Sequence, residues 1–243
     1  MRLGVNIDHV ATLRQARGIN LISPIEAAKT CLEAGADSIV AHLREDRRHI
    51  QDADVVTLRK TAKHFNLEMS INKDIVNIAR RIKPDVSTLV PERRKELTTE
   101  GGLDVITYEK KIAKAIEKLK SVGIRVSLFI DPVKKQIETA KKIGADIIEL
   151  HTGKYADTKS KKGSEKYLAK LQDAAIFAKD IGFVVAAGHG LDYSNTADVV
   201  KIREIEELNI GYSIICHAVF VGLENAVSEM RKLIDRENIY SSI

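Results

Sequence analysis

The sequence predicts an α/β protein, specifically a (β/α)8 TIM barrel with extra helices, formed as a single domain over residues 1–243. Short runs rich in valine and isoleucine alternate with amphipathic helical segments eight times, which is the order and length typical of such a barrel. Glycine follows several helical segments just before the next apolar run, where a left-handed helix cap costs least. The alternative, an open doubly wound sheet, lacks its expected glycine-rich dinucleotide loop after the first strand.

Several of the predicted strands are apolar throughout, as are strands of a parallel sheet that is buried on both faces. The predicted strands are 3–7, 38–43, 67–71, 86–90, 125–130, 146–151, 183–188 and 212–216. The predicted helices lie near 24–34, 52–64, 73–82, 104–122, 133–143, 164–181, 195–206 and 222–237. Amphipathic spacing supports them: in 104–122 the apolar residues fall on one stripe, with lysine and glutamate elsewhere.

The connections between these elements are unequal in length. Links from helix to strand are short, whereas several links from strand to helix are long: 8–22, 43–51, 91–103 and 152–163. In a (β/α)8 barrel the long links emerge together at the C-terminal ends of the strands, where barrel enzymes keep their active sites. We therefore expect a functional site on that rim.

Composition limits the class of protein. The chain has a formal net charge of +5. Because its lysines are spread along helices and form no cluster, this charge indicates nucleic-acid binding only weakly. Its two cysteines form no framework for disulfides and no CxxC pair. The N-terminus runs directly into a strand pattern, and no apolar run reaches the length that spans a membrane. A cytoplasmic protein without membrane or nucleic-acid partners is expected.

Histidines gather at the predicted strand ends. Six of the seven lie at or just beyond one: His9, His42, His49, His151, His189 and His217. Histidine titrates near neutral pH, so such a set on one rim favours proton transfer. A metal site is the competing interpretation, but no closely spaced pair such as His-x-His occurs on one strand.

Two glutamates, Glu68 and Glu149, interrupt apolar strands. A carboxylate inside a barrel requires a partner or a raised pKa, because burying its charge is costly. One interpretation is a structural pair with arginine or lysine, and the other is a general acid or base. The pair Asp8 and His9 follows the first strand, where it would either fix a histidine tautomer or contact substrate.

Glycine-rich and arginine-rich segments indicate phosphate binding. Glycines end the seventh strand (186–190) and surround the eighth (209–223), where many barrels bind phosphate through backbone N–H groups. Segment 98–102, TTEGG, resembles a polar lid or an anion-binding loop. Four arginines provide forked cations that suit phosphate or carboxylate, namely Arg17, Arg44, Arg47 and Arg48.

Long motifs in the chain resemble those of the pyridoxine 5′-phosphate synthase family, from the first strand to the last. They are NIDHVATLRQARG (6–18), HLREDRRHI (42–50), NLEM (66–69), LVPERR-x-E-x-TTEGGLDV (89–105), SLFID (127–131), IELHTG-x-YAD (148–157), AGHGL (187–191) and LNIG (208–211). The resemblance implies a TIM barrel with added helices, assembled as a homo-octamer (a tetramer of dimers). It implies that 1-deoxy-D-xylulose 5-phosphate and 3-amino-2-oxopropyl phosphate are condensed to pyridoxine 5′-phosphate, phosphate and water, with no cofactor and no metal.

The resemblance also implies roles for individual residues. His42 and Glu68 match the proton acceptors, His189 the proton donor, and Glu149 a glutamate that stabilises the transition state. Residues that match the binding site of the amino-ketone phosphate are Asn6, Arg17, Gly190, Gly211 and Tyr212. Those that match the binding site of the deoxyxylulose phosphate are Asp8, His9, Arg44, His49 and Thr98.

The chain departs from the family pattern at Ala186, Tyr212 and Cys216-His217, where the family often has Asn, His, and a small residue followed by Arg. Side-chain contacts to substrate at 212 and 217 are therefore in question. Two other functions stay open from the sequence. One is a different phosphate-handling barrel, such as an isomerase or an indole-glycerol-phosphate-type synthase. The other is an RNA-binding protein, which the pI near 9.0 suggests.

Overall fold

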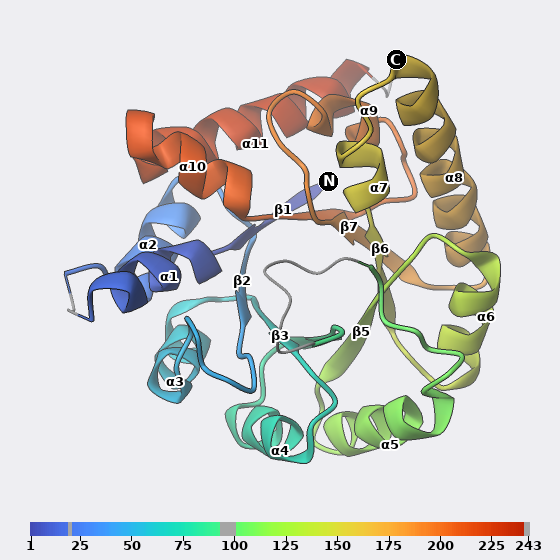
Figure 1. The fold of residues 1–243 in the computed structure, drawn as a ribbon, viewed down its shortest axis with the longest axis horizontal. Coiled ribbons are helices and arrows are strands. Elements are labelled where there is room, and N and C mark those ends of the chain that lie inside the picture. The colour runs from blue at the N-terminus through green and yellow to red at the C-terminus, as the bar shows by residue number, and fades with distance from the viewer. Residues whose placement is uncertain (19–20, 93–100, 241–243) are drawn as a thin grey trace.

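Eight parallel strands close into one barrel, which confirms the predicted fold class (Figure 1). The computed structural model describes residues 1–18, 21–92 and 101–240. Each strand pairs with the next along the chain, and the last pairs with the first. The strands are β1 (Arg2–Asn6), β2 (Ser38–His42), β3 (Phe65–Met69), β4 (Val86–Leu89), β5 (Arg125–Ile130), β6 (Ile147–His151), β7 (Val184–Gly188) and β8 (Glu207–Ile210).

Helices surround this barrel and bury its outer surface (Figure 1). They are α1 (Asp8–Arg17), α2 (Pro24–Glu33), α3 (Asp52–Thr61), α4 (Lys73–Ile82), α5 (Glu109–Lys120), α6 (Lys134–Lys142), α7 (Gly153–Ala156), α8 (Lys161–Asp180), α9 (Thr196–Val200), α10 (Tyr212–Val221) and α11 (Leu223–Tyr240). Local sequence sets their ends. Ser23 caps α2 by accepting a hydrogen bond from the Glu26 N–H, and Asn72 caps α4 in the same way from Asp74. None of the helices in the described residues is both long and apolar enough to cross a membrane.

The hydrophobic core lies between the barrel and its helices. Outward-facing side chains of the strands, such as Leu3, Val5, Leu67 and Met69, are fully buried there. The core is almost entirely aliphatic, as the absence of tryptophan requires. Each such side chain contributes about 1.5–3 kcal/mol when it is removed from water, so this layer supplies most of the driving force for folding.

The inside of the barrel is polar. Hydrogen bonds link inward-facing side chains of different strands. Thr88 Oγ1 on β4 donates to Asn66 Oδ1 on β3 (2.8 Å), and Asn209 Nδ2 on β8 donates to Glu149 Oε2 on β6 (2.7 Å). Interiors of such barrels are usually filled with bulky branched side chains. Here small and polar side chains leave a cavity of about 550 Å³ that is lined by residues at the N-terminal ends of the strands and reaches Asn209. The interior therefore tolerates carboxyl groups such as Glu149, because hydrogen-bond partners accompany them.

The prediction of the eighth strand is wrong. Residues 212–216 begin helix α10, and the strand is the preceding segment, Glu207–Ile210. A short apolar run does not distinguish a strand from a buried helical turn. The true strand has only four residues, of which Glu207 and Asn209 are polar and face the barrel interior, so its hydrophobic signal is weak.

Two predicted loops and one predicted helix also differ from the structure. The expected loop 8–22 contains helix α1, and the loop 152–163 contains the short helix α7. The expected helix 195–206 is helical only in α9, over Thr196–Val200. Helix α1 has a low apolar content, which explains why its periodicity is inconspicuous. These extra helices lie at the C-terminal ends of β1 and β6, so they form part of the rim.

A nearly buried ion pair holds α1 against α3, and a further hydrogen bond joins α1 to the loop between β2 and α3. The guanidinium of Arg14 donates to both carboxylate oxygens of Asp54, at 2.7 Å each, and also to the backbone oxygen of His49 at 3.1 Å. The two side chains are only 11% and 10% exposed. A charge left without its partner in such a place is costly.

We predict that Asp54→Asn lowers the free energy of unfolding by about 3 kcal/mol, because Arg14 loses a charged bidentate partner. Urea unfolding followed by circular dichroism measures this change. Lys29→Ala is the matched control, since the Lys29–Glu26 pair is 51% and 69% exposed and should contribute less than about 1 kcal/mol. Equal effects of the two substitutions would contradict the assignment of Arg14–Asp54 as the stabilising contact.

Candidate active site

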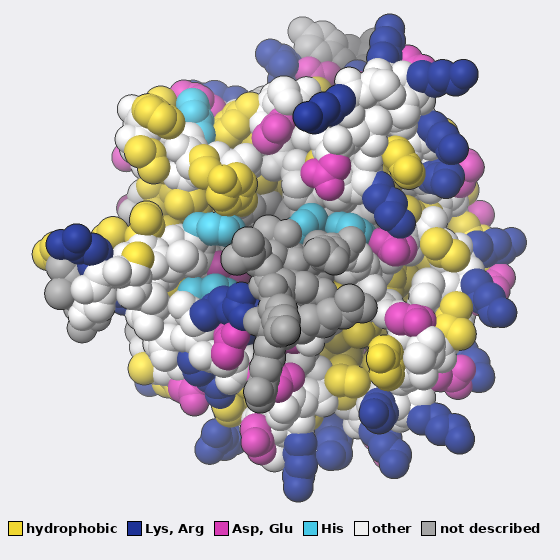
Figure 2. Space-filling view, viewed as in Figure 1, with side chains coloured by type: hydrophobic (Ala, Val, Ile, Leu, Met, Phe, Trp, Pro, Cys, Tyr) yellow, Lys and Arg dark blue, Asp and Glu magenta, His cyan; other side chains and the backbone are white. Residues whose placement is uncertain are grey.

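Predicted site residues from different strands come together at the C-terminal rim of the barrel. Histidine side chains lie near the middle of the face in Figure 2, while lysine and arginine side chains are concentrated along its edge. The histidines follow β1, β2, β6 and β7, so barrel closure rather than sequence proximity brings them together.

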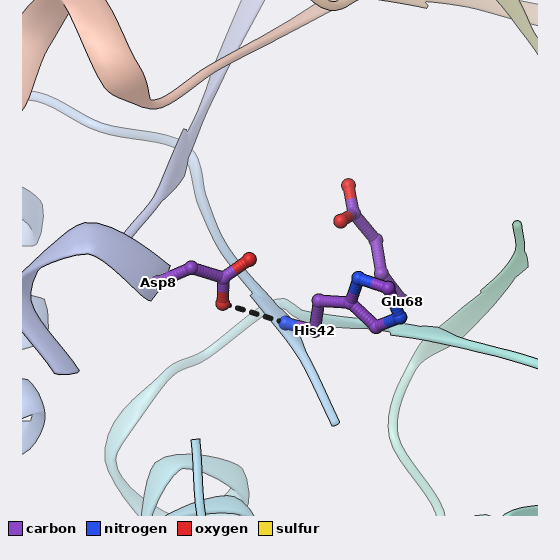
Figure 3. Close-up of side chains that lie close together, drawn as sticks. All are labelled: Asp8, His42 and Glu68. Carbon is purple, nitrogen blue, oxygen red and sulfur yellow. Dashed lines mark hydrogen bonds between the residues drawn. The ribbon is translucent and has the colours of Figure 1, made fainter. Parts of the chain in front are cut away.

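The side chains of Asp8 and Asn6 together connect the ends of three strands. Asp8 Oδ1 accepts a hydrogen bond from the backbone N–H of His42 at 2.8 Å (Figure 3). The side-chain amide of Asn6 donates to Asp8 Oδ2 at 3.0 Å and to Glu68 Oε2 at 3.3 Å, and Asn6 Oδ1 accepts from the Asp8 N–H at 2.9 Å. Four predicted site residues, from β1, α1, β2 and β3, thus form one hydrogen-bonded group.

His42 has a carboxylate partner on its other side. Its Nε2 lies 2.9 Å from Glu92 Oε1, and both side chains are less than 10% exposed. Burial opposes ionisation of Glu92, but the hydrogen bond and charge of His42, the Glu45 N–H and Arg44 together lower the pKa of its carboxyl. Glu92 is therefore ionised at neutral pH and oriented towards the imidazole.

The two predicted interior glutamates have raised pKa values. Burial is the main cause for Glu68, and the charges of Glu149 and Asp8 raise its pKa further, against the hydrogen bond from Asn6. Burial also raises the pKa of Glu149 to about 7, although the Asn209 hydrogen bond lowers it and Glu207 raises it. No arginine or lysine pairs with either carboxyl among the described residues, which argues against the purely structural interpretation. With a pKa of about 7, the Glu149 carboxyl can donate or accept a proton near neutral pH.

His189 belongs to a second group on the opposite side of the rim. Its ring lies edge-to-face on that of His151, with 5.1 Å between centroids, and His151 Nδ1 lies 3.0 Å from Asp131 Oδ1. Burial lowers the pKa of His189 to about 4, and the nearby His151 contributes to the decrease. His189 also has a positive φ of 81°, a conformation uncommon outside glycine that is typical of functional sites.

The remaining predicted histidines, His9 and His49, adjoin the Asp8 group. The His9 ring contacts Tyr212 at 5.1 Å between centroids, and the His49 ring lies 6.1 Å from that of His42. Burial lowers the pKa of both, while Asp8 opposes this effect. His49 Nδ1 accepts the Ile50 N–H at 2.9 Å, so in the neutral ring Nε2 carries the proton.

The other predicted binding residues differ from one another in burial and in their contacts. Arg44 is buried beside Asp46, with 3.6 Å between Nε and Oδ1, whereas Arg17 is exposed in the last turn of α1. Gly211 packs against Asn6 so closely that a Cβ would lie 2.8 Å from the Asn6 Cβ. Gly190 has a φ of 79° and follows His189 directly. Thr98 lies outside the described residues.

His217 does not belong to the site, which corrects the count of six rim histidines. It lies within α10, where its Nε2 is 2.7 Å from Glu229 Oε2 on α11 and its ring packs on Tyr193. The misassigned strand explains the error, because His217 follows residues 212–216. Its contacts indicate that it fastens α10 to α11.

The charged loop 43–51 is held by its own ion pairs. Arg47 Nε lies 2.6 Å from Asp52 Oδ1, and Arg48 Nη2 lies 2.6 Å from Asp46 Oδ2. The side chain of Glu45 accepts hydrogen bonds from Ser70 (2.8 Å) and Asn72 (3.0 Å) on the neighbouring connection. These charges therefore shape the loop that carries Arg44 and His49.

The sequence patterns assign no role to Glu92 or Asp131, and they include His151 only as one of the rim histidines. Each of the three contacts a predicted catalytic histidine or its neighbour. Glu92 and Asp131 lie three residues and one residue beyond the ends of β4 and β5. A carboxylate just after a barrel strand is the signal that could have identified them.

Asp8, His42 and Glu68 also place three possible metal ligands within 4.8 Å of one another. One imidazole and two carboxylates are a donor set that a divalent cation accepts. Here both oxygens of Asp8 and one of Glu68 already accept hydrogen bonds from Asn6 and the His42 backbone. Those contacts suit a proton-transfer site, so we assign no metal to it.

A closed (β/α)8 barrel with acid–base groups on the C-terminal rim defines the protein as an enzyme of the TIM-barrel class. The family model described as pyridoxal phosphate biosynthesis protein PdxJ matches residues 3–236. The chain belongs to this family.

Curated relatives agree with this assignment. A pyridoxine 5′-phosphate synthase of Coxiella burnetii (strain Dugway 5J108-111) is 54% identical over 96% of this chain and 98% of its own length. One of Citrifermentans bemidjiense is 55% identical, with the same coverage. The crystal structure of the Amycolatopsis orientalis BexX/CysO complex matches with a TM-score of 0.66 and 13% identity, over 99% of this chain and 91% of that one. This last likeness shows the fold alone.

We predict that Glu149→Gln removes a pH-dependent loss of stability. The folded-state pKa of Glu149, about 7, lies above its unfolded value near 4.5, so its contribution to stability is present below pH 4.5 and is lost as the pH rises through 7. The wild type should therefore lose stability relative to Glu149→Gln, by a few kcal/mol, between pH 5 and pH 8. Urea unfolding of both proteins at the two pH values measures this. Parallel stability curves would show that Glu149 is ionised throughout.

Proposed function

We propose that this protein is a pyridoxine 5′-phosphate synthase. It condenses 1-deoxy-D-xylulose 5-phosphate with 3-amino-2-oxopropyl phosphate and closes the pyridine ring, with release of phosphate and water. The observation that carries this proposal is the similarity to enzymes of that name over 96% of the chain. The rim supports it, because its groups suit a reaction made of many proton transfers.

His42 and Glu68 are the proposed proton acceptors. Imine formation, elimination of phosphate, dehydration and carbon–carbon bond formation each move a proton on carbon, oxygen or nitrogen. His42 and Glu68 lie on neighbouring strands, paired in register, and Asp8 and Asn6 hold them in one hydrogen-bonded group. Burial raises the pKa of Glu68, so that its carboxylate is a stronger base than an exposed glutamate and accepts a proton more readily.

His189 is the proposed proton donor, and Glu149 the group that stabilises developing positive charge. With its pKa lowered to about 4, His189 is neutral at pH 7 without substrate. Two phosphate groups bound nearby would raise that pKa, because negative charge favours the imidazolium. His189 would then carry a proton to donate when the phosphorylated substrates are bound. Glu149 lies within the barrel below this rim, next to Gly188, where a Cβ would be 2.5 Å from its Oε1.

We propose two phosphate sites on the rim. For the amino-ketone phosphate, Gly211 and Tyr212 form the N-terminus of α10, whose free N–H groups and helix dipole favour an anion. Backbone contacts of this kind are insensitive to the Tyr212 side chain, which is 67% exposed. Asn6, Arg17 and Gly190 complete that site. For the deoxyxylulose phosphate, we propose binding by Asp8, His9, Arg44, His49 and Thr98.

We also propose that the enzyme is cytoplasmic and assembles as a homo-octamer, a tetramer of dimers. Val219 and Phe220 of α10 are 73% and 86% exposed, and apolar side chains so exposed on one helix support contact with another subunit. The yellow patch over α10 in Figure 2 marks this surface. No cofactor and no metal enter the proposed reaction.

We predict that His42→Asn, Glu68→Gln and His189→Asn each lower kcat by 100-fold or more, because general acid–base groups typically contribute about 10²–10⁴-fold. The assay mixes metal-stripped protein with both phosphorylated substrates and follows pyridoxine phosphate by absorbance and released phosphate in parallel. Matched appearance of both products supports the function and its independence of metal.

His64→Asn is the control, because His64 lines the cavity at the other end of the barrel. It should leave kcat within about 2-fold. Wild-type protein that is folded but forms no product would refute the function, and full turnover by all three variants would refute the assignment of roles.

A further inference from the structure

Glu92 uses both of its carboxylate oxygens to join His42 to the loop after β2. Oε1 lies 2.9 Å from His42 Nε2, and Oε2 accepts the backbone N–H of Glu45 at 3.0 Å. The Glu92 side chain is 6% exposed, so water does not compete effectively for either contact. None of the substrate contacts proposed above involves Glu92.

The geometry determines which ring nitrogen faces the other proposed catalytic groups. Nε2 is engaged by Glu92, while the nitrogen next to Cγ, Nδ1, lies on the side of the Asp8 and Glu68 carboxylates (Figure 3). One ligand atom from each of these three residues lies within 4.8 Å of the others. Nδ1 is thus the nitrogen directed to the centre of the proposed site.

A neutral imidazole has one N–H donor and one acceptor nitrogen, whereas an ionised carboxylate only accepts hydrogen bonds. Glu92 already accepts the Glu45 N–H, and its lowered pKa means that it carries no proton to donate at neutral pH. The contact with His42 therefore requires the proton on Nε2, and Nδ1 keeps its lone pair.

We propose that Glu92 is a positioning residue that holds neutral His42 in the tautomer protonated at Nε2, so that Nδ1 is the atom that accepts the proton from substrate. The inference rests on the proposed function of His42 as a base and adds the identity of the reacting nitrogen. When Nδ1 takes a proton, the ring becomes an imidazolium, and the adjacent Glu92 carboxylate stabilises that charge.

Glu92→Gln tests the inference, because it should reverse the tautomer. The Glu45 N–H requires an acceptor, so the glutamine oxygen should take that position and turn the NH2 group towards His42 Nε2. Nε2 would then accept a hydrogen bond, and the proton would move to Nδ1. We expect kcat to fall about 100-fold or more, with the KM of both substrates within about 3-fold, as for other losses of a tautomer-fixing carboxylate.

Glu206→Gln is the control, since it neutralises a carboxylate that pairs with Lys179 at the other end of the barrel. It should keep kcat within about 3-fold. The second readout is nitrogen NMR of protein labelled with ¹⁵N-histidine, with the His42 signals identified by their loss in His42→Asn. In the wild type and in Glu206→Gln, the protonated nitrogen should be Nε2, and in Glu92→Gln it should be Nδ1.

Nδ1 protonated in neutral His42 of the wild type would overturn the inference, and so would full turnover by Glu92→Gln. Loss of activity in Glu92→Gln with an unchanged tautomer would also overturn it, since Glu92 would then only hold the loop. The wild-type spectrum decides the tautomer even if Glu92→Gln does not fold. Absence of turnover in the wild type would instead refute the proposed function, independently of the tautomer.

Discussion

The carboxylate of Asp8 is the contact on which the rim depends. It joins the backbone of His42 at the end of β2 to Asn6 at the end of β1, and Asn6 in turn reaches Glu68 on β3. Barrel closure brings these strand ends together, but pairing of backbones does not orient side chains. The Asn6 amide orients the carboxylates of Asp8 and Glu68 by donating to both, and Glu92 contacts the ring of His42 from the opposite side. The proposed bases are thereby preorganised before substrate binds.

The polar barrel interior has a second consequence, which is electrostatic. Glu68 and Glu149 lie within low-dielectric surroundings with further carboxylates nearby, so the pKa of each is raised. Asn6 and Asn209 provide one hydrogen bond to each, which limits the cost of burial. Lysine or arginine partners would have stabilised the same positions more, but they would have fixed both carboxyls in the ionised form. The protein is therefore less stable than it would be with such ion pairs, but its interior carboxyls can take part in acid–base chemistry.

The sequence was sufficient to predict the barrel, seven of its strands and the rim on which the candidate site residues meet, because long-range closure follows from repeated local patterns. It was insufficient where tertiary contacts override local hydrophobicity. The polar strand Glu207–Ile210 is stabilised by its neighbours, and the apolar segment Tyr212–Val221 is a helix. The partners of the histidines, Glu92 and Asp131, could not be assigned because they come from other strands. The roles of individual site residues came from the family resemblance, and the structure supplies their geometry.

A crystal structure of the protein with pyridoxine 5′-phosphate bound would test the location of the active site most directly. We expect the pyridine ring between His42 and His189, with the phosphate at the N-terminus of α10 and Nδ1 of His42 facing the ring. Product bound in the cavity at the other end of the barrel, or on the rim away from Asp8, His42 and Glu68, would contradict it.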